Sequence, residues 1–131
     1  MASIFTKIIN REIPAHIVAE DNRHIAFLDI NPLAKGHTLV IAKREEDYIF
    51  DLSNDELAAL ILFSKRMAKA IQSTIPCNRI GVSVIGLEVP HAHIHLVPIN
   101  HTGDINFTNP KLILSTEEFV AIADKIKSAF K

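Results

Sequence analysis

The sequence contains a single cysteine, Cys77, no tryptophan and only four glycines in 131 residues. One cysteine excludes an internal disulfide and a cysteine-rich zinc site, so we expect a reducing, cytoplasmic setting. The longest apolar run, residues 57–63, is far too short to cross a bilayer. The N-terminus has no basic region followed by an apolar region, so we expect neither a membrane partner nor a signal peptide.

Concentrated positive charge is missing as well. The formal net charge is −1, and no dense run of lysine or arginine provides the basic face that binding to nucleic acid requires. Hydrophobic residues make up 48% and charged residues 22%, which is typical of a globular chain. We therefore expect one domain, residues 1–131, with one core and no nucleic-acid partner.

The pattern of apolar residues and turn residues predicts alternating short elements. A short helix is expected over residues 4–10, a long helix over 53–75 and a last helix from 115 onward. Both later helices begin with a capping box, Ser53 to Glu56 and Ser115 to Glu118. The expected strands are 17–20, 24–30, 37–41, 79–85 and 92–99. This order predicts an α+β fold, with a mostly antiparallel five-stranded sheet, one long central helix and a C-terminal helix.

Three of the seven histidines, His91, His93 and His95, alternate along one expected strand. Side chains of a strand alternate between its two faces, so these three share a face, about 6.5–7 Å apart along the strand. Ala92, Ile94 and Leu96 take the other face and can enter the core. One face of the strand is therefore chemical, and the other is structural.

Three aligned imidazoles have two specific uses, besides forming a merely polar surface exposed to water. They can bind zinc or copper, or one ring can attack a phosphorus atom while the others hydrogen-bond to its oxygens. Strand spacing argues mildly against a metal, because the outer rings would both have to lean toward the middle one. Spacing alone leaves both chemistries open.

The flanking residues extend the pattern. Residues 91–97, His-Ala-His-Ile-His-Leu-Val, resemble the signature of the histidine triad (HIT) superfamily of nucleotide hydrolases and transferases. Residues 4–15, 26–32 and 36–41 resemble three earlier motifs of its Hint branch, at similar spacing. The resemblance implies a HIT-like fold, an enzyme that acts on nucleotides, and a homodimer.

The resemblance also assigns roles to four histidines. His93 is implied as the nucleophile that forms a transient nucleotidyl-histidine, which water then resolves. Neutral imidazole suits this role, because it needs no deprotonation and its ordinary pKa is about 6.5. His95 is implied as a contact of the α-phosphate or leaving group, and His91 as a residue that orients the site. His37, from another strand, is the fourth histidine of the family.

The nucleotide-binding residues follow from the same resemblance. Asp29 resembles the carboxylate that accepts both ribose hydroxyls. An apolar slot for a purine is implied by the residues that stand where the family lines its base pocket: Phe5, Ile8, Ile13, Phe27, Leu28 and Ile30. The implied substrate is a purine nucleoside monophosphate derivative, an adenosine phosphoramidate above all.

The sequence departs from the family pattern in the phosphate loop, residues 81–90. This stretch is shorter than usual and has no asparagine or glutamine. Glu88 stands where a hydroxyl often contacts phosphate, and a carboxylate there repels an anionic substrate unless it turns away. We expect Ser83 to replace the missing amide side chain and the backbone around Gly86 to supply donors.

A second departure concerns metal. Many bacterial relatives carry Cys-x-x-Cys near the start as part of a structural zinc site, whereas this chain has Ser3 and Thr6 there. We expect no metal and no cofactor. Three alternatives to the phosphoramidase stay open: a dinucleoside polyphosphate hydrolase, a purine-nucleotide-binding regulatory module with weak turnover, and a protein that binds metal through the triad and His37.

Overall fold

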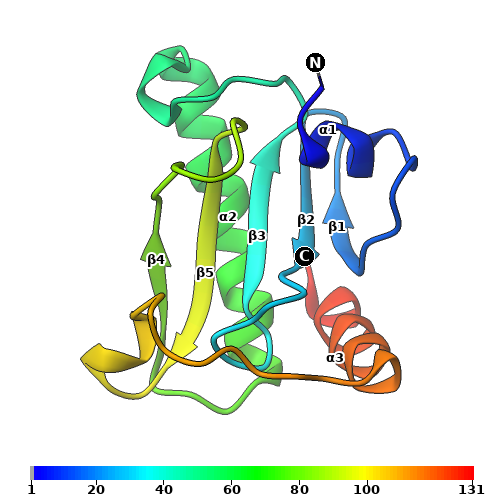
Figure 1. The fold of residues 1–131 in the computed structure, drawn as a ribbon, viewed down its shortest axis with the longest axis vertical. Helices are drawn as coiled ribbons and strands as arrows, with labels where there is room; N and C mark the ends of the chain where they lie inside the picture. The colour runs from blue at the N-terminus through cyan, green and yellow to red at the C-terminus, as the bar shows by residue number, and fades with distance from the viewer. Residues whose placement is uncertain (1) are drawn as a thin grey trace.

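Five antiparallel strands form one sheet in the computed structural model, which describes residues 2–131. The sheet order is β1-β2-β3-β5-β4 (Figure 1). Its strands are β1 (Ile17–Glu20), β2 (His24–Leu28), β3 (Thr38–Ala42), β4 (Arg79–Ser83) and β5 (His93–Ile99). Strand β5 therefore lies between β3 and β4, so both of its edges are hydrogen-bonded and its position is tightly held.

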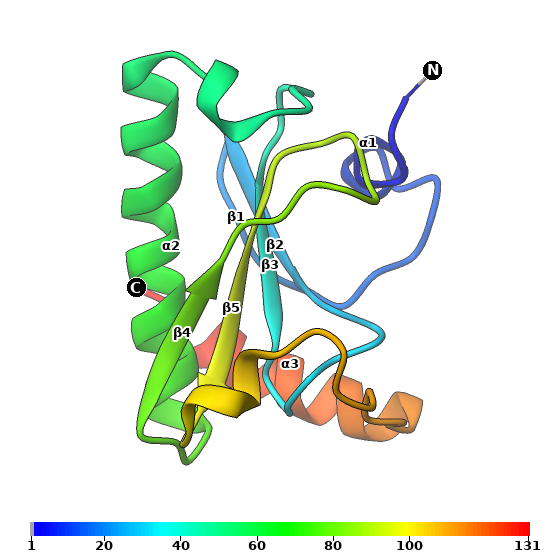
Figure 2. The ribbon, with the colours of Figure 1, turned by 60° about the vertical axis from the view of Figure 1, so that its left-hand side comes forward.

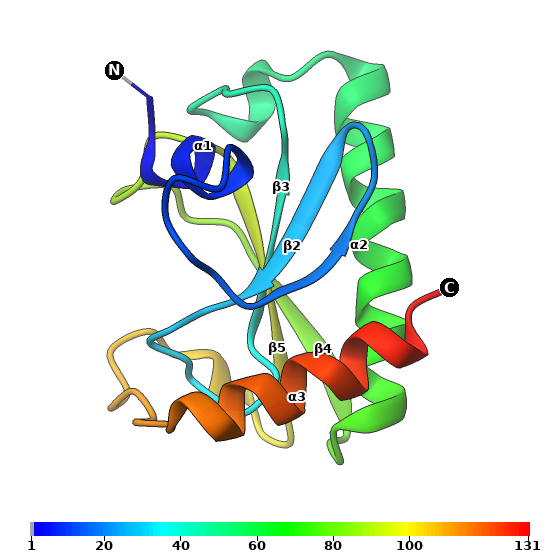
Figure 3. The same ribbon diagram turned by 90° about the vertical axis from the view of Figure 1, so that its right-hand side faces the viewer.

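The two faces of the sheet carry different helices. Helix α2 (Asn54–Thr74) lies along one face, and the short helix α1 (Ile4–Ile9) lies beside the other (Figure 2). Helix α3 (Thr116–Ala129) packs against β1 and β2 and ends near α2, as its position at the bottom of Figure 3 shows. Two short 3-10 helices lie between these elements: η1 (Ile49–Asp51) precedes α2, and η2 (Thr102–Ile105) follows β5. Among residues 2–131, no helix combines the length and apolar character needed to span a membrane.

Each face has its own apolar cluster. The larger one joins the sheet to α2 and α3, and includes Ile94 and Leu96 of β5. The smaller one joins α1 to the opposite face and includes Phe5 of α1 and Phe27 of β2. The alternation expected for β5 is therefore confirmed, since Ile94 and Leu96 bury in the cluster under α2 while His93 lies on the side of α1.

The expected elements are confirmed, with small shifts at their ends. Ser53 and Ser115 both cap their helices with complete capping boxes. The second strand ends at Leu28 instead of residue 30, and β4 ends at Ser83 instead of residue 85. His91 precedes β5, which begins at His93, because the backbone of residue 92 bonds to the loop after β3 instead, where Ala92 N donates to Glu46 O at 2.6 Å.

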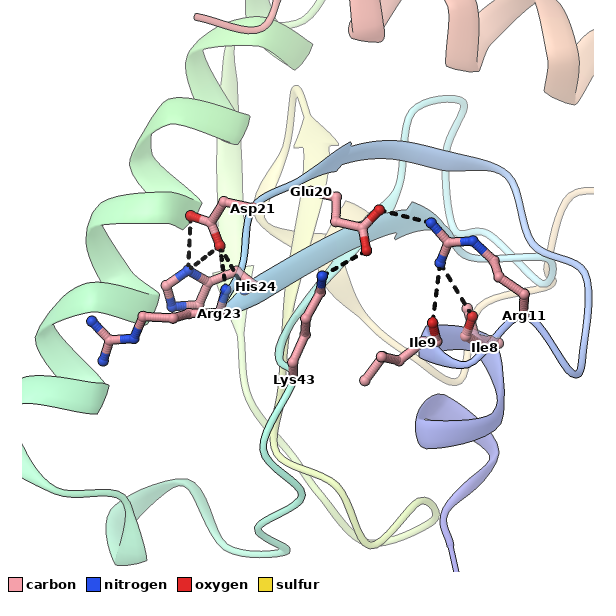
Figure 4. A network of polar contacts seen from close by, with 8 residues as sticks. All are labelled: Ile8, Ile9, Arg11, Glu20, Asp21, Arg23, His24 and Lys43. Carbon is pink, nitrogen blue, oxygen red and sulfur yellow. Dashed lines mark hydrogen bonds and ion pairs between the residues drawn. The ribbon is translucent and has the colours of Figure 1, made fainter.

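Charged side chains fix the loop between α1 and β1, which borders the site (Figure 4). Arg11, with φ of 62°, turns the chain, and its guanidinium donates to the carbonyl oxygens of Ile8 and Ile9. The same group bonds to Glu20 at 2.7 Å, and Glu20 also bonds to Lys43 at 2.7 Å. This network ties the C-terminal end of α1 to β1 and to the end of β3.

Candidate active site

A cavity of about 510 Å³ lies on the α1 side of the sheet, within the range of roughly 300–1,000 Å³ that is usual for small-molecule sites. Helix α1, the ends of β2 and β5, the loop from residue 85 to 89, and the segment after η2 all contribute to its wall. Much of the wall is apolar, and the rings of Phe5 and Phe27 meet edge to face at 5.4 Å. His93 and His95 contribute polar groups.

His93 has a defined tautomer. Its Nδ1 lies 2.7 Å from the backbone oxygen of His91. A carbonyl only accepts hydrogen bonds, so Nδ1 carries the proton and, in the neutral ring, Nε2 keeps a free lone pair. No buried side-chain nitrogen or oxygen in the described part of the chain lacks a partner. The unbonded Nε2 is therefore open to the cavity that His93 lines.

His95 has the opposite tautomer, because His37 fixes it. The backbone N–H of Leu33 donates to Nδ1 of His37 at 3.0 Å, so the proton of the neutral His37 ring is on Nε2. That group lies 3.0 Å from Nδ1 of His95 and donates to it, which puts the proton of His95 on Nε2. Burial lowers the pKa of His37 to about 3 and that of His95 to about 4, so both rings are neutral near pH 7.

The cavity therefore presents a lone pair next to a hydrogen-bond donor. The ring centroids of His93 and His95 are 5.0 Å apart, closer than the expected 6.5–7 Å. This short distance shows that the two rings lean toward each other, and their planes are inclined by 64°. One phosphoryl group can contact both rings.

His91 lies beside the cavity and not in its wall. Its Nε2 donates to the carbonyl oxygen of Ala42 at 2.7 Å, and its Nδ1 lies 2.8 Å from the hydroxyl of Ser3. The ring is 1% exposed, and burial lowers its pKa. Both ring nitrogens are bonded within the protein, and the contact that His91 makes with His93 is through its backbone carbonyl.

Asp29 lies in the cavity wall just beyond the end of β2. Burial raises the pKa of its carboxyl group, and one of its oxygens accepts from the backbone N–H of Asn31 at 2.9 Å. Its other oxygen lies 3.6 Å from Nε2 of His37. A ligand that donates hydrogen bonds, such as a pair of hydroxyl groups, fits this half-buried carboxylate.

Asp29, His37 and His95 could also be considered as metal ligands, since their ligand atoms lie within 4.8 Å of one another. However, Nε2 of His37 carries a proton and donates a hydrogen bond to Nδ1 of His95, so neither nitrogen has a free lone pair. Ser3 and Thr6, at the positions of the zinc-binding cysteines, hydrogen-bond to His91 and Glu45. Their hydroxyls do not suit structural zinc.

The structure brings together most of the residues that the sequence singled out. The cavity is lined by His93 and His95 and by all but one of the expected nucleotide-binding residues, namely Phe5, Ile8, Ile13, Phe27, Leu28, Asp29, Ile30, Gly86 and Glu88. His37 and His91 stand behind this wall. Gly86 turns the loop with φ of 76°, a conformation that favours glycine.

Ser83 and Leu28 are placed differently from the other expected binding residues. Ser83 pairs with His95 across the sheet, but it does not line the cavity, because β4 is the edge strand and the wall begins only at Ile85. Leu28 does border the cavity, yet its side chain belongs to the apolar cluster under α2 and α3. Alternation along β2 turns Leu28 away from the face that carries Phe27.

The sequence did not single out Phe107 and Lys111, which both line the cavity from the segment after η2. The ring of Phe107 meets His95 at 4.7 Å and His37 at 6.0 Å. Lys111 donates to the backbone oxygens of Phe107 and Asn109. An aromatic and a basic residue in an otherwise polar stretch were the available signals, but the irregular backbone there has no period that would orient them.

Known proteins are similar to this chain along most of its length. A model of the HIT domain family matches residues 10–102. An uncharacterised HIT-like protein of Methanocaldococcus jannaschii is 40% identical over 108 residues, covering 77% of this chain and 81% of that protein. The adenosine 5'-monophosphoramidase hnt1 of Schizosaccharomyces pombe is 32% identical over 133 residues and the full length of both chains.

Solved structures agree. A Hit-like protein involved in cell-cycle regulation from Bartonella henselae is similar with a TM-score of 0.85 and 34% identity, covering 98% of this chain and 96% of that one. A HIT family protein from Bacillus anthracis has a TM-score of 0.73 and 31% identity, with coverage of 98% and 96%. With sequence, fold and the histidine arrangement in agreement, the chain belongs to the HIT domain family.

Proposed function

We propose that the chain is an enzyme that hydrolyses an adenosine 5'-phosphoramidate or a related phosphoanhydride at the α-phosphate, through a covalent nucleotidyl-His93 intermediate. One observation carries the proposal: the 2.7 Å hydrogen bond from Nδ1 of His93 to the carbonyl of His91 directs the lone pair of Nε2 into the cavity. The name of the hnt1 relative, an adenosine 5'-monophosphoramidase, supports the choice of substrate.

The nucleotide is held by the residues around this nitrogen. The base occupies the apolar slot between α1 and β2, where Phe5 and Phe27 provide flat surfaces for stacking. The ribose hydroxyls donate to Asp29. The α-phosphate then reaches His93 and His95, and the Nε2–H of His95 donates to a phosphate oxygen whose negative charge grows during the attack.

In the first step, the lone pair of Nε2 of His93 forms a bond to phosphorus and the bond from phosphorus to the leaving nitrogen breaks. The leaving amine keeps that electron pair and takes a proton from solvent. The nucleotidylated ring is now cationic, and the carbonyl of His91 stabilises it by accepting the Nδ1–H. The free energy of the intermediate therefore depends on this backbone contact.

In the second step, water attacks the same phosphorus. The bond from phosphorus to Nε2 breaks, its electron pair returns to the ring, and the proton lost by water goes to solvent. The sum is a phosphoramidate plus water giving a nucleoside monophosphate and an amine. Each protonation of one step is balanced in the other, so the chain needs no cofactor for this reaction.

Turnover of an adenosine phosphoramidate tests the proposal. We expect the wild type to release adenosine monophosphate and His93→Ala to fall to background, while both bind adenosine monophosphate. Binding by the wild type without turnover would favour a nucleotide-binding regulatory module instead. Loss of turnover upon chelation would favour the metal-dependent alternative.

A dinucleoside polyphosphate hydrolase is the second candidate, and Lys111 is the observation that favours it. This residue borders the cavity, and the third N–H of its ammonium group, beside the two bonded to Phe107 and Asn109, can bind a further phosphate of a polyphosphate leaving group. Comparing kcat/KM for an adenosine phosphoramidate and a diadenosine polyphosphate distinguishes the two. Lys111→Met should lower only the second value if the polyphosphate is the substrate.

We also propose that the enzyme is a homodimer. Strand β4 is an end strand, so one of its edges has no neighbouring strand within residues 2–131. Apolar side chains on and just beyond this strand are exposed, with Val82 at 60%, Val84 at 40% and Ile85 at 48%. An open edge flanked by apolar side chains favours pairing with a second copy of the chain.

A further inference from the structure

A cluster of four polar side chains lies next to the cavity, where the start of α1 meets the loop after β3. We call it the anchor cluster: Ser3, Thr6, Glu45 and His91. One carboxylate oxygen of Glu45 accepts from the backbone N–H of Ser3 at 2.6 Å and from the hydroxyl of Thr6 at 2.6 Å. The hydroxyl of Ser3 accepts from the backbone N–H of Thr6 at 3.0 Å, which begins the helix.

The cluster ends on the ring of His91. Because Nε2 of this neutral ring donates to Ala42, Nδ1 is an acceptor, and the hydroxyl of Ser3 donates to it at 2.8 Å. The hydroxyl of Thr6 lies 3.4 Å from the same nitrogen. The carboxylate of Glu45 is 3.9 Å away. Glu45 thus fixes Ser3 and Thr6, and the hydroxyl of Ser3 fixes the ring.

His91 connects this cluster to the reacting atom. The ring and the carbonyl belong to one residue, and the carbonyl accepts the Nδ1–H of His93. Phe5, between the two hydroxyl residues on α1, contacts the rings of both His91 and His93, with centroids 6.0 and 4.9 Å apart. A shift of the cluster therefore moves both the partner of the nucleophile and the wall against which its ring packs.

We propose that Glu45 is a positioning residue for His93, acting through Ser3, Thr6 and the backbone carbonyl of His91. This inference rests on the proposed role of His93 as the nucleophile. A carboxylate is suited to the task, because hydrogen bonds to a charged acceptor are stronger than those to a neutral one. Bonds from the Thr6 side chain and the Ser3 backbone lower the pKa of Glu45 to about 2, so it is ionised throughout the neutral range.

The test compares Glu45→Ala with Glu45→Gln, and uses Glu46→Ala as a matched control in the same loop. Glu46 pairs with Arg44 at its side chain, and its contact to Ala92 uses only the backbone, which the substitution keeps. Long-range ¹H–¹⁵N correlation spectra show which ring nitrogen of His93 carries the proton. Steady-state kinetics with an adenosine phosphoramidate give kcat and KM separately.

We expect Glu45→Ala to lose the single Nδ1–H form of His93 and to lower kcat by about ten- to a hundredfold, since small misplacements of reacting groups have effects of this size. Glu45→Gln should restore both properties, because its amide oxygen still accepts both hydrogen bonds. Glu46→Ala should match the wild type. If Glu45→Ala does not fold, Thr6→Val, which keeps the side-chain shape, should show a smaller loss of the same kind.

A folded Glu45→Ala or Thr6→Val protein with the tautomer of His93 and the kcat of the wild type would overturn the proposal. The spectra need no substrate, so this arm gives its answer even if the protein turns over no phosphoramidate. Absence of turnover in the wild type would contradict the proposed function alone, whereas an unchanged tautomer would contradict the positioning role alone.

Discussion

Backbone carbonyls and amides, instead of charged side chains, decide the chemistry of the individual histidines. The carbonyl of His91 fixes the proton of His93 on Nδ1, and the amide of Leu33 fixes that of His37 on Nε2. A backbone group does not titrate, so these two tautomers hold over a wide pH range as long as the rings are neutral. These tautomers suit the proposed attack by His93 and the proposed hydrogen-bond donation by His95.

The burial of His37 predicts a specific dependence of stability on pH. Its pKa is about 3 in the folded protein, against about 6.5 in an unfolded chain. Between these values the unfolded chain binds a proton that the folded chain excludes. The free energy of unfolding therefore falls as the pH falls from about 6.5 toward 3, by up to about 1.4 kcal/mol per pH unit from this group.

His37→Gln removes this titration and retains an amide that donates to His95. We expect urea unfolding between pH 4 and pH 6 to show a slope against pH that is smaller in the variant by about 1.4 kcal/mol per unit. All other titrating groups are common to both proteins. Parallel curves for the two proteins would show that His37 is not excluded from protonation by folding.

The sequence predicted the positions of these histidines and not their protonation. A strand has a period of two, so the spacing of His91, His93 and His95 sufficed to place their rings on one side. The proton positions depend on the amide of Leu33 and the carbonyls of Ala42 and His91, which are backbone groups. Every residue has those atoms, so no side-chain pattern indicates them.

One face of strand β5 packs into the core, and the other faces the cavity. Ile94 is fully buried in the cluster under α2, while His93 points to the cavity on the other face. Its central place, paired with β3 and β4, keeps both sets of side chains in register. A small change on one face should therefore leave the other face in place.

Ile94→Val tests this separation. Removing one buried methyl group should lower the free energy of unfolding by about 0.5–1.5 kcal/mol, because the small cavity left behind does not fully close. At temperatures where the variant is folded, kcat should equal that of the wild type. Denaturant unfolding and steady-state kinetics on the same samples measure both. A kcat that drops along with stability would show that the two faces are coupled.

The position of the irregular segment between β5 and α3 could not be predicted from the sequence. The sequence left open whether the stretch from His101 onward packs at the site. Phe107 lies against His95, and Leu112 donates from its backbone to the carbonyl of Pro32 at 2.9 Å, so the segment closes one side of the cavity. Such contacts between loops follow from the folded sheet and leave no periodic signal in the sequence.

The domain described by the structure is longer than the stretch that the family model matches. The matched region, residues 10–102, excludes both α1 and α3. Yet Phe5 lines the cavity, and Phe119 and Ile126 of α3 bury in the main core. We therefore propose that residues 1–131 form a single HIT domain. The cytoplasmic location stays a prediction from the single cysteine.

The proposed dimer predicts a mass and a variant that changes it. Sedimentation equilibrium should give twice the mass of 14.6 kDa for the wild type. Val82→Asp places a charge on the exposed side chain of β4, and burying that charge in an interface is costly, so this variant should be a monomer. Ile113→Asp serves as the control, because Ile113 lies outside β4 and is almost fully exposed. A monomeric wild type would contradict the proposal.

The attack by His93 is tested most directly by trapping its adduct. The wild type is mixed with an adenosine phosphoramidate, quenched within milliseconds at alkaline pH, where phosphohistidine bonds persist, and digested for mass spectrometry. We expect one adenylyl group on the peptide that contains His93, formed before the first turnover is complete and missing in His93→Ala. Turnover by the wild type without any adduct, or an adduct that persists in His93→Ala, would contradict nucleophilic attack by His93.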